Sequence, residues 1–301
     1  MSKVVAPGSE LKSAGRLNIG LLLIALAILL VVIKPYLPEF LIRLPALLVV
    51  PFADAINFLF FFIKDDLGFI HVTRAIAGGV ESLLDVTANL LYGKRRWPRI
   101  GPIPWTTIAL TAGCIGYALG GWRLALLGAG TFCWAALMGQ WKWTMETMSV
   151  IVVAVPVAVL IGLLLGVAAW RSTRFEKVIS PLLNVAQSLP HFAYMIPVVV
   201  FIGVGPKSGA IVTIIFAVPP MVRMTLLGLR KVPPEVVESG QMCGSTKWQL
   251  LRKVRIPTAR TELLVGVNQV IMQSLAMVVL ASFIGMPGLG QKLLQLLQSL
   301  K

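Results

Sequence analysis

The segment Glu238-Ser-Gly-Gln-Met-Cys-Gly244, followed after nine residues by Val254-Arg-Ile-Pro257, lies between two long apolar runs. These runs cover residues 211–229 and 263–284, and each is close to the ~20 helical residues that cross a bilayer. The segment between them carries seven lysine or arginine residues over positions 230–260, so it cannot lie in lipid. Because basic residues are enriched in cytoplasmic loops, we expect this segment on the cytoplasmic side of a membrane.

The same segment has the pattern of two short helices joined by a tight turn. Pro233-Pro234 suits a first helical turn, where the missing N–H is not needed. Gly244 permits a tight turn, and Thr246 with Gln249 matches a capping box that starts the second helix. Pro257 is expected to end that helix, because proline lacks the N–H that a helix interior uses. A basic helix-turn-helix beside a membrane domain is typical of a docking element.

This pattern resembles the EAA loop of ABC importer permeases, in which Glu-Ala-Ala is followed by three residues, a glycine, nine residues and an apolar-x-apolar-Pro ending. Glu238 and Gly244 match that spacing, and Ser239 and Gly240 replace the alanines but stay small, so close packing against a partner is preserved. In the family this loop inserts into a groove of a cytoplasmic ATPase and transmits its closure to the membrane helices. The resemblance therefore implies ATPase-coupling roles for Glu235, Glu238, Ser239, Gly240, Gly244, Lys247 and Pro257.

Further segments resemble the glycine betaine/proline permease branch of that family, over roughly residues 122–291; the first hundred residues resemble it only loosely. The branch imports glycine betaine, proline, choline or related methylated amines. A quaternary ammonium is best recognised by an aromatic cage, which in the family belongs to the extracytoplasmic substrate-binding protein. The segments that carry this resemblance are Gln187–Pro197, Ile214–Pro220, Gly266–Gln269 and Gly288–Gln291.

Composition points to a polytopic helical membrane protein. The 301 residues are 57% hydrophobic and 13% charged, with a mean hydropathy of +0.86, which leaves too little charge for a soluble domain of this length. The net charge of +15 reflects basic residues gathered at the ends of apolar runs, where they fix orientation. The aromatic–basic interleaving that binds single strands is lacking, so nucleic acid is not an expected partner.

The sequence predicts neither a cofactor nor catalysis by this chain. Cys114, Cys133 and Cys243 show no pairing logic and are expected to be free thiols. Two histidines, His71 and His191, without a cysteine or carboxylate cluster support no metal site. A Gly-x-x-x-x-Gly-Lys-Ser/Thr loop is lacking as well, so ATP hydrolysis would need a separate subunit.

The apolar pattern predicts an all-α membrane protein, which the resemblance narrows to a type I ABC importer transmembrane domain with cytoplasmic EAA coupling helices. The run before Ile33 shows no cleavage site after it, so a retained anchor is expected. Phe40–Ile63, broken by charge and proline, is expected along the interface, and Ile70–Leu91 as an amphipathic surface helix. The predicted spans are Leu17–Ile33, Ile103–Gly120, Leu124–Gly139, Met145–Ala169, Leu182–Val204, Gly209–Leu229 and Leu263–Ile284.

Orientation follows by counting spans back from a cytoplasmic coupling loop. Arg171–Lys177 and the N-terminus are then inside, and Gln140–Glu146 is outside. Lys94–Arg99 is also predicted outside despite its charge, because the connecting segment exceeds the ~60 residues over which the charge rule holds.

Three parts follow from these spans. Residues 1–102 form an N-terminal anchor with an extracytoplasmic or interfacial tail, 103–142 form accessory spans, and 143–301 form the permease core with a coupling loop at 230–258. Family members continue past the Gly-Leu-Gly turn into another span, whereas Lys292–Lys301 supplies a short amphipathic stub. Either the chain is part of a longer polypeptide or the last helix is missing.

Polar residues inside spans are costly and are candidates for function. Asn268, Gln269 and Gln273 fall within about one turn of the last span, so they either line a pathway or hydrogen-bond to a neighbouring helix. Arg223 lies under two turns from the cytoplasmic end of its span, where it either snorkels to the interface or forms a charged gate.

The sequence therefore predicts a permease subunit in the bacterial inner membrane, which imports a compatible solute or methylated amine with a cytoplasmic ATPase, an extracytoplasmic binding protein and a second permease subunit, identical or not. One alternative is a self-sufficient secondary transporter or channel, which would need intramembrane carboxylates that the region 145–284 lacks apart from boundary and loop acids. The other is a scaffold subunit whose basic segment is an ordinary solvated loop.

Overall fold

The computed structural model describes residues 69–93 and 101–300, together with short pieces at 24–26, 28–29, 33–34, 58 and 62. These residues are helical and contain no strand, which confirms the all-α class. The chain forms two compact units, residues 1–62 and 63–301, and all the helices described below belong to the second.

Three predictions fall on residues that are largely or wholly outside this description. They are the N-terminal anchor at 17–33, the interfacial segment at 40–63 and the basic run at 94–99. All three stay predictions.

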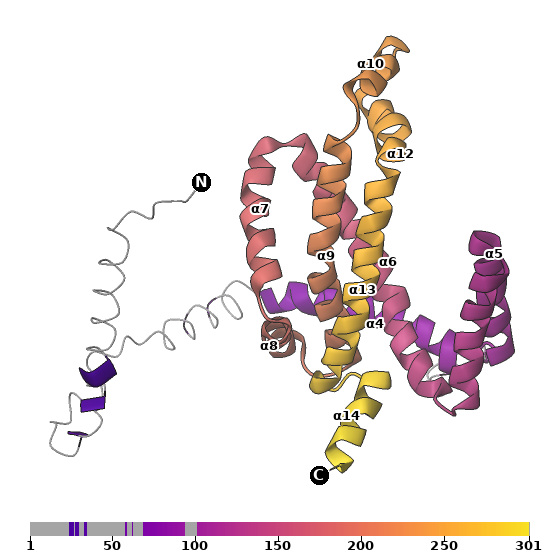
Figure 1. Cartoon of the computed structure of the whole chain (residues 1–301), viewed down its shortest axis with the longest axis vertical. Coiled ribbons are helices and arrows are strands. Elements are labelled where there is room, and N and C mark those ends of the chain that lie inside the picture. The colour runs from indigo at the N-terminus through magenta and orange to yellow at the C-terminus, as the bar shows by residue number, and fades with distance from the viewer. Residues whose placement is uncertain are drawn as a thin grey trace, which may run out of the picture. The chain divides into compact units, whose positions relative to one another are not determined.

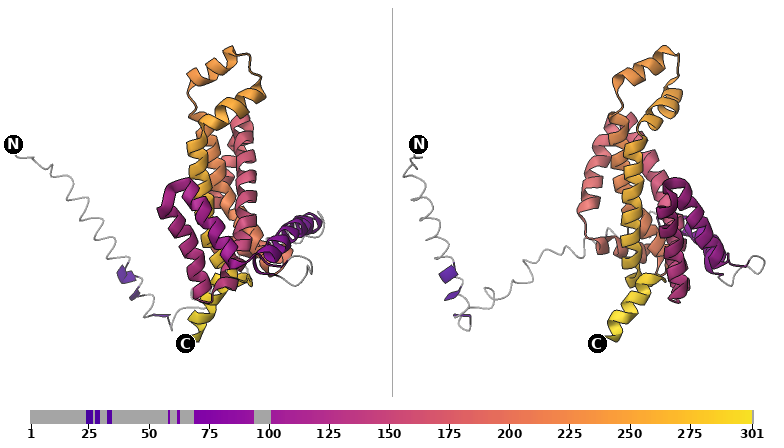
Figure 2. Two further views of the ribbon diagram at one scale, coloured as in Figure 1. Left: turned by 90° about the vertical axis from the view of Figure 1, so that its right-hand side faces the viewer. Right: turned by 45° about the vertical axis from the view of Figure 1, so that its right-hand side comes forward.

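Three long helices form the centre of the second unit: α6 (Trp141–Arg171), α9 (Pro206–Arg230) and α13 (Arg260–Leu280). They lie side by side in all views (Figure 1, Figure 2). Glycines let α6 and α9 approach closely, since a Cβ added at Gly166 would lie 2.5 Å from the Cβ of Thr225. Small residues at such contacts are the usual means by which membrane helices associate.

The lengths of these helices agree with the predicted spans. Among the described residues four helical segments are long and apolar enough by residue count to cross a membrane, namely α5, α6, α9 and the segment 260–284, in which a 3₁₀ turn (Ala281–Ile284) extends α13. The segment α5 reaches this length only when its two arms are counted together. The helix α6 has 31 residues and thus spans about 46 Å, more than the ~30 Å hydrocarbon core. The predicted spans at 145–169, 209–229 and 263–284 are confirmed as helices.

The predicted span at 182–204 is not a single straight helix. The structure has two helices there, α7 (Thr173–Ser188) and α8 (His191–Ile202), bent by 105°. The break lies at Leu189, which is extended (φ −71°, ψ 139°) because the following Pro190 disfavours a helical conformation in the residue before it. The segment is therefore a broken span or a re-entrant loop.

Two further predicted spans, at 103–120 and 124–139, form a tight hairpin, α5 (Trp105–Leu137). Its turn is at Gly120 and Gly121, where Gly121 has a left-handed φ of 74°. The two arms approach closely, since a Cβ at Gly116 would lie 2.6 Å from the carbonyl oxygen of Leu124. Each arm has about 16 residues and extends about 24 Å, less than the ~30 Å hydrocarbon core.

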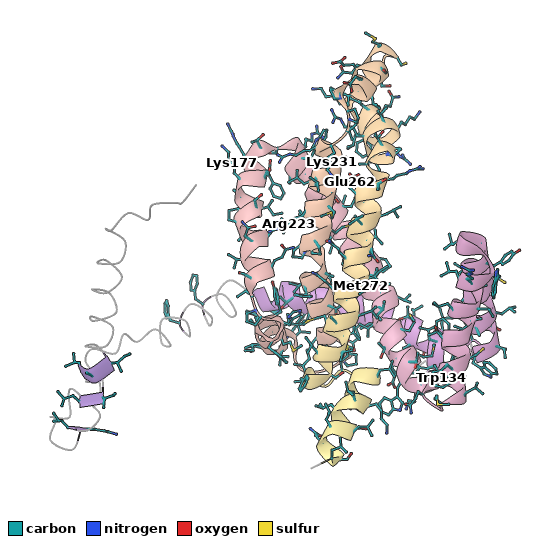
Figure 3. The ribbon with its side chains drawn as sticks, in the orientation of Figure 1. Trp134, Lys177, Arg223, Lys231, Glu262 and Met272 are labelled. Carbon is teal, nitrogen blue, oxygen red and sulfur yellow. The ribbon has the colours of Figure 1, made fainter. Side chains whose placement is uncertain are left out.

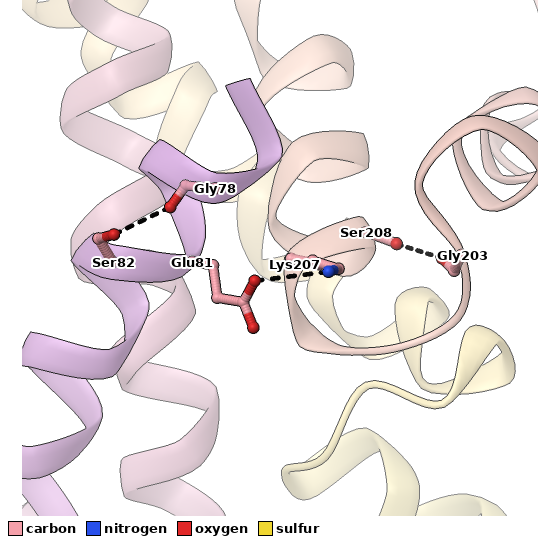
Figure 4. A network of polar contacts seen from close by, with 6 residues as sticks. All are labelled: Gly78, Glu81, Ser82, Gly203, Lys207 and Ser208. Carbon is pink, nitrogen blue, oxygen red and sulfur yellow. Dashed lines mark hydrogen bonds and ion pairs between the residues drawn. The ribbon is translucent and has the colours of Figure 1, made fainter. Parts of the chain in front are cut away.

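The end of the bundle opposite the coupling loop is crossed by α4 (Phe69–Tyr92) (Figure 1), which confirms the helix predicted at 70–91. Its face with Ala77, Val80 and Leu84 is buried against the bundle. Lys207 Nζ at the start of α9 lies 3.4 Å from Glu81 Oε2 of α4 (Figure 4). At the same end, the backbone N–H of Leu289, the first residue of α14 (Leu289–Ser299), donates to Thr147 Oγ1 of α6 at 2.9 Å.

Candidate coupling loop and membrane cavity

The loop between α9 and α13 is a helix-turn-helix, as predicted. The first helix is α10 (Pro234–Met242), with proline at its first position. Gly244 forms the turn with a φ of 72°. The capping box is present: the N–H of Thr246 donates to Gln249 Oε1 at 2.9 Å, and the N–H of Gln249 donates to Thr246 Oγ1 at 3.4 Å.

The second helix ends at Thr258, which agrees with the end predicted at Pro257 to within one residue. That helix consists of α11 (Lys247–Gln249), a π-helical stretch (Leu250–Arg255) and α12 (Ile256–Thr258), so it passes through Pro257. The wider π-helical turns just before the proline accommodate its missing N–H. The chain turns into α13 at Ala259, whose φ and ψ are −78° and 4°.

The loop has a small apolar core of its own, which includes Leu229, Val237, Leu250 and Leu251. Gly240 lies where α10 crosses the second helix, since a Cβ there would be 2.7 Å from Leu250 Cδ1. Its small size is therefore needed for packing within the loop. The core holds the two short helices as one rigid element at the end of the bundle.

The remaining predicted coupling residues lie on the outside of this element. It forms one end of the second unit in Figure 1. Two residues that the sequence argument did not select, Met242 and Trp248, are 89% and 64% exposed on the same element. The exposed coupling residues are Glu235, Glu238, Ser239, Gly244, Lys247 and Pro257.

Ion pairs connect the base of the loop to the neighbouring helices. Arg230, the last residue of α9, pairs with Glu176 of α7, and Lys231 Nζ lies 3.4 Å from Glu262 Oε1 of α13 (Figure 3). Such partly exposed pairs contribute little stability, but they show which segments meet. The basic segment at 171–177 is therefore at the coupling-loop end of the bundle, as the predicted topology requires.

The four predicted pathway residues line one cavity of about 550 Å³ between α7, α9 and α13. Phe216, Pro220 and Arg223 of α9 are four and three residues apart, so they share one face of the helix. Asn268 lies about 100° around the helix from Gln269, so helical geometry alone does not decide which way it faces. In the structure it lines the same cavity as Gln269. The other lining residues are Ala186 and Gln187 of α7, Met224 of α9, and Gln269, Met272 and Gln273 of α13.

The polar residues follow one another along the cavity. A Cβ at Gly266 would be 2.9 Å from Met221 Sδ and from Met224 Cβ, so Gly266 of α13 is level with this part of α9. Because α9 and α13 are antiparallel, Gln269 and Gln273 lie about one and two turns farther from the coupling loop than Gly266. The buried Oε1 of Gln273 accepts no hydrogen bond from the described residues.

Arg223 points from α9 toward α7 (Figure 3), where its guanidinium donates to Asn184 Oδ1. Farther from the coupling loop, Phe216 meets two aromatic rings: the ring centroids of His191 and Tyr194 lie 4.5 Å and 5.6 Å from its own. The sequence argument missed Asn184 and Phe216. Phe216 could have been found from its position seven residues before Arg223, which places both on one helix face.

Comparison with known proteins places this arrangement in a family. Residues 158–300 match the family described as binding-protein-dependent transport system inner membrane component. Carnitine transport permease protein OpuCB of Listeria monocytogenes is 32% identical over 154 residues, which cover 51% of this chain and 69% of that protein. The chain belongs to this family. It is accordingly a multi-pass protein of the bacterial inner membrane.

Two other relatives are longer than the present chain. Trimethylamine N-oxide transport system permease protein TmoV of Ruegeria pomeroyi is 56% identical over 288 residues, 95% of this chain and 44% of that protein. Glycine betaine/proline betaine transport system permease protein ProW of Escherichia coli is 39% identical over 184 residues, 60% of this chain and 52% of that protein. The chain thus spans about half of their length or less. All three are named as transport permeases and none as an enzyme.

Proposed function

We propose that the protein is the membrane-spanning permease subunit of an ATP-driven importer for a small methylated amine. The observation that carries this is the cavity, whose polar lining residues other than Gln187 of α7 lie on α9 and α13, the two helices that the coupling loop joins. A displacement of the loop would move both cavity walls, because its apolar core and the close contacts between the helices resist deformation. ATP hydrolysis in a cytoplasmic partner would thereby open or close the cavity.

The relatives named above carry trimethylamine N-oxide, glycine betaine, proline betaine or carnitine. These compounds share a methylated nitrogen and an anionic oxygen and are neutral overall. We extend this class to the present chain. A cavity of about 550 Å³ is large enough for any of them.

Three partners complete the proposal: a cytoplasmic ATPase on the exposed face of α10, an extracytoplasmic binding protein that delivers the solute, and a second permease subunit. The second subunit would cover α13, which exposes Leu264, Met272, Leu275 and Val279 at helical spacing. Asn268 lies on the same exposed face and also lines the cavity. The pathway would therefore lie close to the contact between the two permease subunits.

A secondary transporter is the alternative, and one buried carboxylate favours it. Glu146 of α6 is 7% exposed. It lies beside Tyr92 of α4. Burial raises the pKa of the Tyr92 phenol, and the nearby carboxylates of Glu146 and Asp85 raise it further. Glu146 is not among the lining residues of the cavity, so it is poorly placed to couple an ion to solute movement there.

The proposal predicts that Glu238→Lys or Gly244→Trp abolishes uptake while the protein stays in the membrane. Reversed charge or added bulk on the docking face would block ATPase engagement and lower uptake at least ~10-fold. The measurement is uptake of labelled trimethylamine N-oxide and glycine betaine in cells that express the chain with its ATPase and binding protein, together with co-purification of the ATPase.

Gly121→Trp is the matched control for Gly244→Trp. Both glycines have a left-handed φ, 74° and 72°, and neither has an atom within 4 Å of an added Cβ. Both substitutions therefore strain the backbone alike, but Gly121 lies in the turn of α5. Normal uptake and normal ATPase co-purification by Gly244→Trp would exclude the coupling role. Uptake that persists without any ATPase would favour the secondary transporter.

A further inference from the structure

The lining of the cavity contains one fixed positive charge and no carboxylate. The charge belongs to Arg223, whose guanidinium donates to the neutral side chain of Asn184. The ion pairs at the coupling-loop end of the bundle use Arg230 and Lys231 instead. Within the described part of the chain, Arg223 therefore has no ionic partner. Because arginine does not lose its proton in proteins, this charge is permanent.

The other end of the cavity is aromatic. Phe216 lies on the same face of α9, seven residues before Arg223, and both line the cavity. Seven residues of helix separate the two by about 10 Å along the axis. The rings of His191 and Tyr194 contact Phe216 but are not among the lining residues of the cavity. Aromatic faces attract methylated ammonium groups, so the two ends of the cavity favour opposite charges.

We propose that this cavity sorts solutes by charge type: it admits methylated amines that carry an anionic oxygen and excludes methylated cations that lack one. The inference rests on the proposed function, since it assumes that solute passes through the cavity. A dipolar solute can place its ammonium toward Phe216 and its oxygen toward Arg223. A cation without an anionic oxygen is repelled by the charge of Arg223, and it has no oxygen whose attraction to Arg223 would offset this repulsion. At the separation of about 10 Å given above and an effective dielectric constant of about 20, two unit charges repel enough to lower occupancy roughly 16-fold.

Two nearly isosteric solutes isolate this effect. Trimethylamine N-oxide and tetramethylammonium have the same tetrahedral shape and differ in one substituent, an anionic oxygen in place of a methyl group. Glycine betaine and choline form a second pair, in which a carboxylate takes the place of a neutral hydroxymethyl group. Size and methylation are matched within each pair, so a difference in binding reports the charge.

The test is equilibrium dialysis of the two labelled solutes at millimolar concentration against the purified full chain, without a binding protein that could select first. Wild type should retain trimethylamine N-oxide at least ~10-fold better than tetramethylammonium, within the limit set by the repulsion above. Arg223→Gln should bring this ratio close to one, mainly because tetramethylammonium now binds. Arg223→Lys should keep the ratio above that of Arg223→Gln, because it keeps the charge.

Asn184→Ala is the matched control, since it removes the hydrogen bond of Arg223 and leaves the charge. Its ratio should match wild type, and melting measurements on each variant identify loss of fold. An unchanged ratio in Arg223→Gln, or a wild type that retains both solutes equally or neither, overturns the inference. Uptake by the complete transporter separates this result from a failure of the proposed function. Uptake of the N-oxide with an unchanged ratio in Arg223→Gln contradicts only the charge filter, whereas absence of uptake for every solute contradicts the function itself.

Discussion

Gln269 and Gln273 are four residues apart on α13, and both line the cavity. Gln269→Leu should lower uptake several-fold, because it removes an amide from the proposed pathway, and should leave melting nearly unchanged. If the amide held two helices together instead, its loss would cost about 0.6–2 kcal/mol. Uptake kinetics and detergent melting on the same variant separate these outcomes, and Met272→Leu is the control because it conserves the volume and polarity of a lining residue. Unchanged uptake and unchanged melting together would assign Gln269 no role.

The pathway residues could be predicted because amides and charges inside apolar runs are conspicuous in a sequence. The sequence could not predict that Asn268 shares the cavity with Gln269. Adjacent residues point about 100° apart around a helix, so both face one cavity only if a third helix forms its opposite wall at some distance. Here α7 provides that wall, with Ala186 and Gln187. Asn184 was missed for the same reason: its role depends on where α7 packs, which the sequence does not state.

At the scale of helices, the contact between α6 and α9 depends on Gly166. An added Cβ would lie 2.5 Å from Thr225 Cβ and 3.0 Å from the carbonyl oxygen of Val222, so one of the helices must move. Gly166→Ala should therefore destabilise the protein by about 1–3 kcal/mol, as overpacking does. Thermal unfolding in detergent measures the effect.

Gly79→Ala in α4 is the control for this substitution. An added Cβ at Gly79 meets nothing within 4 Å, so the same change should stabilise the helix by about 0.5–1 kcal/mol. Equal and small effects of the two variants would show that α6 and α9 do not pack as closely as the structure places them.

Helix positions were predictable where apolar runs are long, whereas the effect of each proline on its helix was not. Composition alone predicts one span for the apolar run that contains Pro190. The helix nevertheless breaks there, because Pro190 holds Leu189 in an extended conformation. Pro257 was expected to end a helix, and the helix ends one residue later, at Thr258, after the π-helical stretch at 250–255. Whether a proline bends, breaks or continues a helix is decided by whether its neighbours satisfy the freed backbone groups, and this is a tertiary property.

At the scale of the second unit, the bundle has two chemically different ends. The coupling loop, the basic segment at 171–177 and the ion pairs of Arg230 and Lys231 lie at one end. The helix α4 and the Gly-Leu-Gly turn at 288–290 lie at the other (Figure 2). Because basic residues are enriched on the cytoplasmic side, we expect the first end to face the cytoplasm, and in this orientation the proposed ATPase partner could reach the loop.

This orientation predicts the accessibility of two positions on a background without Cys114, Cys133 and Cys243. Trp97→Cys should react with a membrane-impermeant thiol reagent added outside the cell, and Ser172→Cys should react only after the membrane is opened. Position 97 tests the prediction most severely, because its basic neighbours at 94–96 would by themselves favour the cytoplasm. Its outward placement depends on counting spans back from the coupling loop through α6 and both arms of α5. Labelling of position 172 but not 97 from outside would show that the whole bundle has the opposite orientation. It would contradict the cytoplasmic placement of the coupling loop. Labelling of neither would place 97 inside and leave the core orientation standing, and would mean that the segment between 97 and 141 crosses the membrane an odd number of times, so that the two arms of α5 are not a pair of spans.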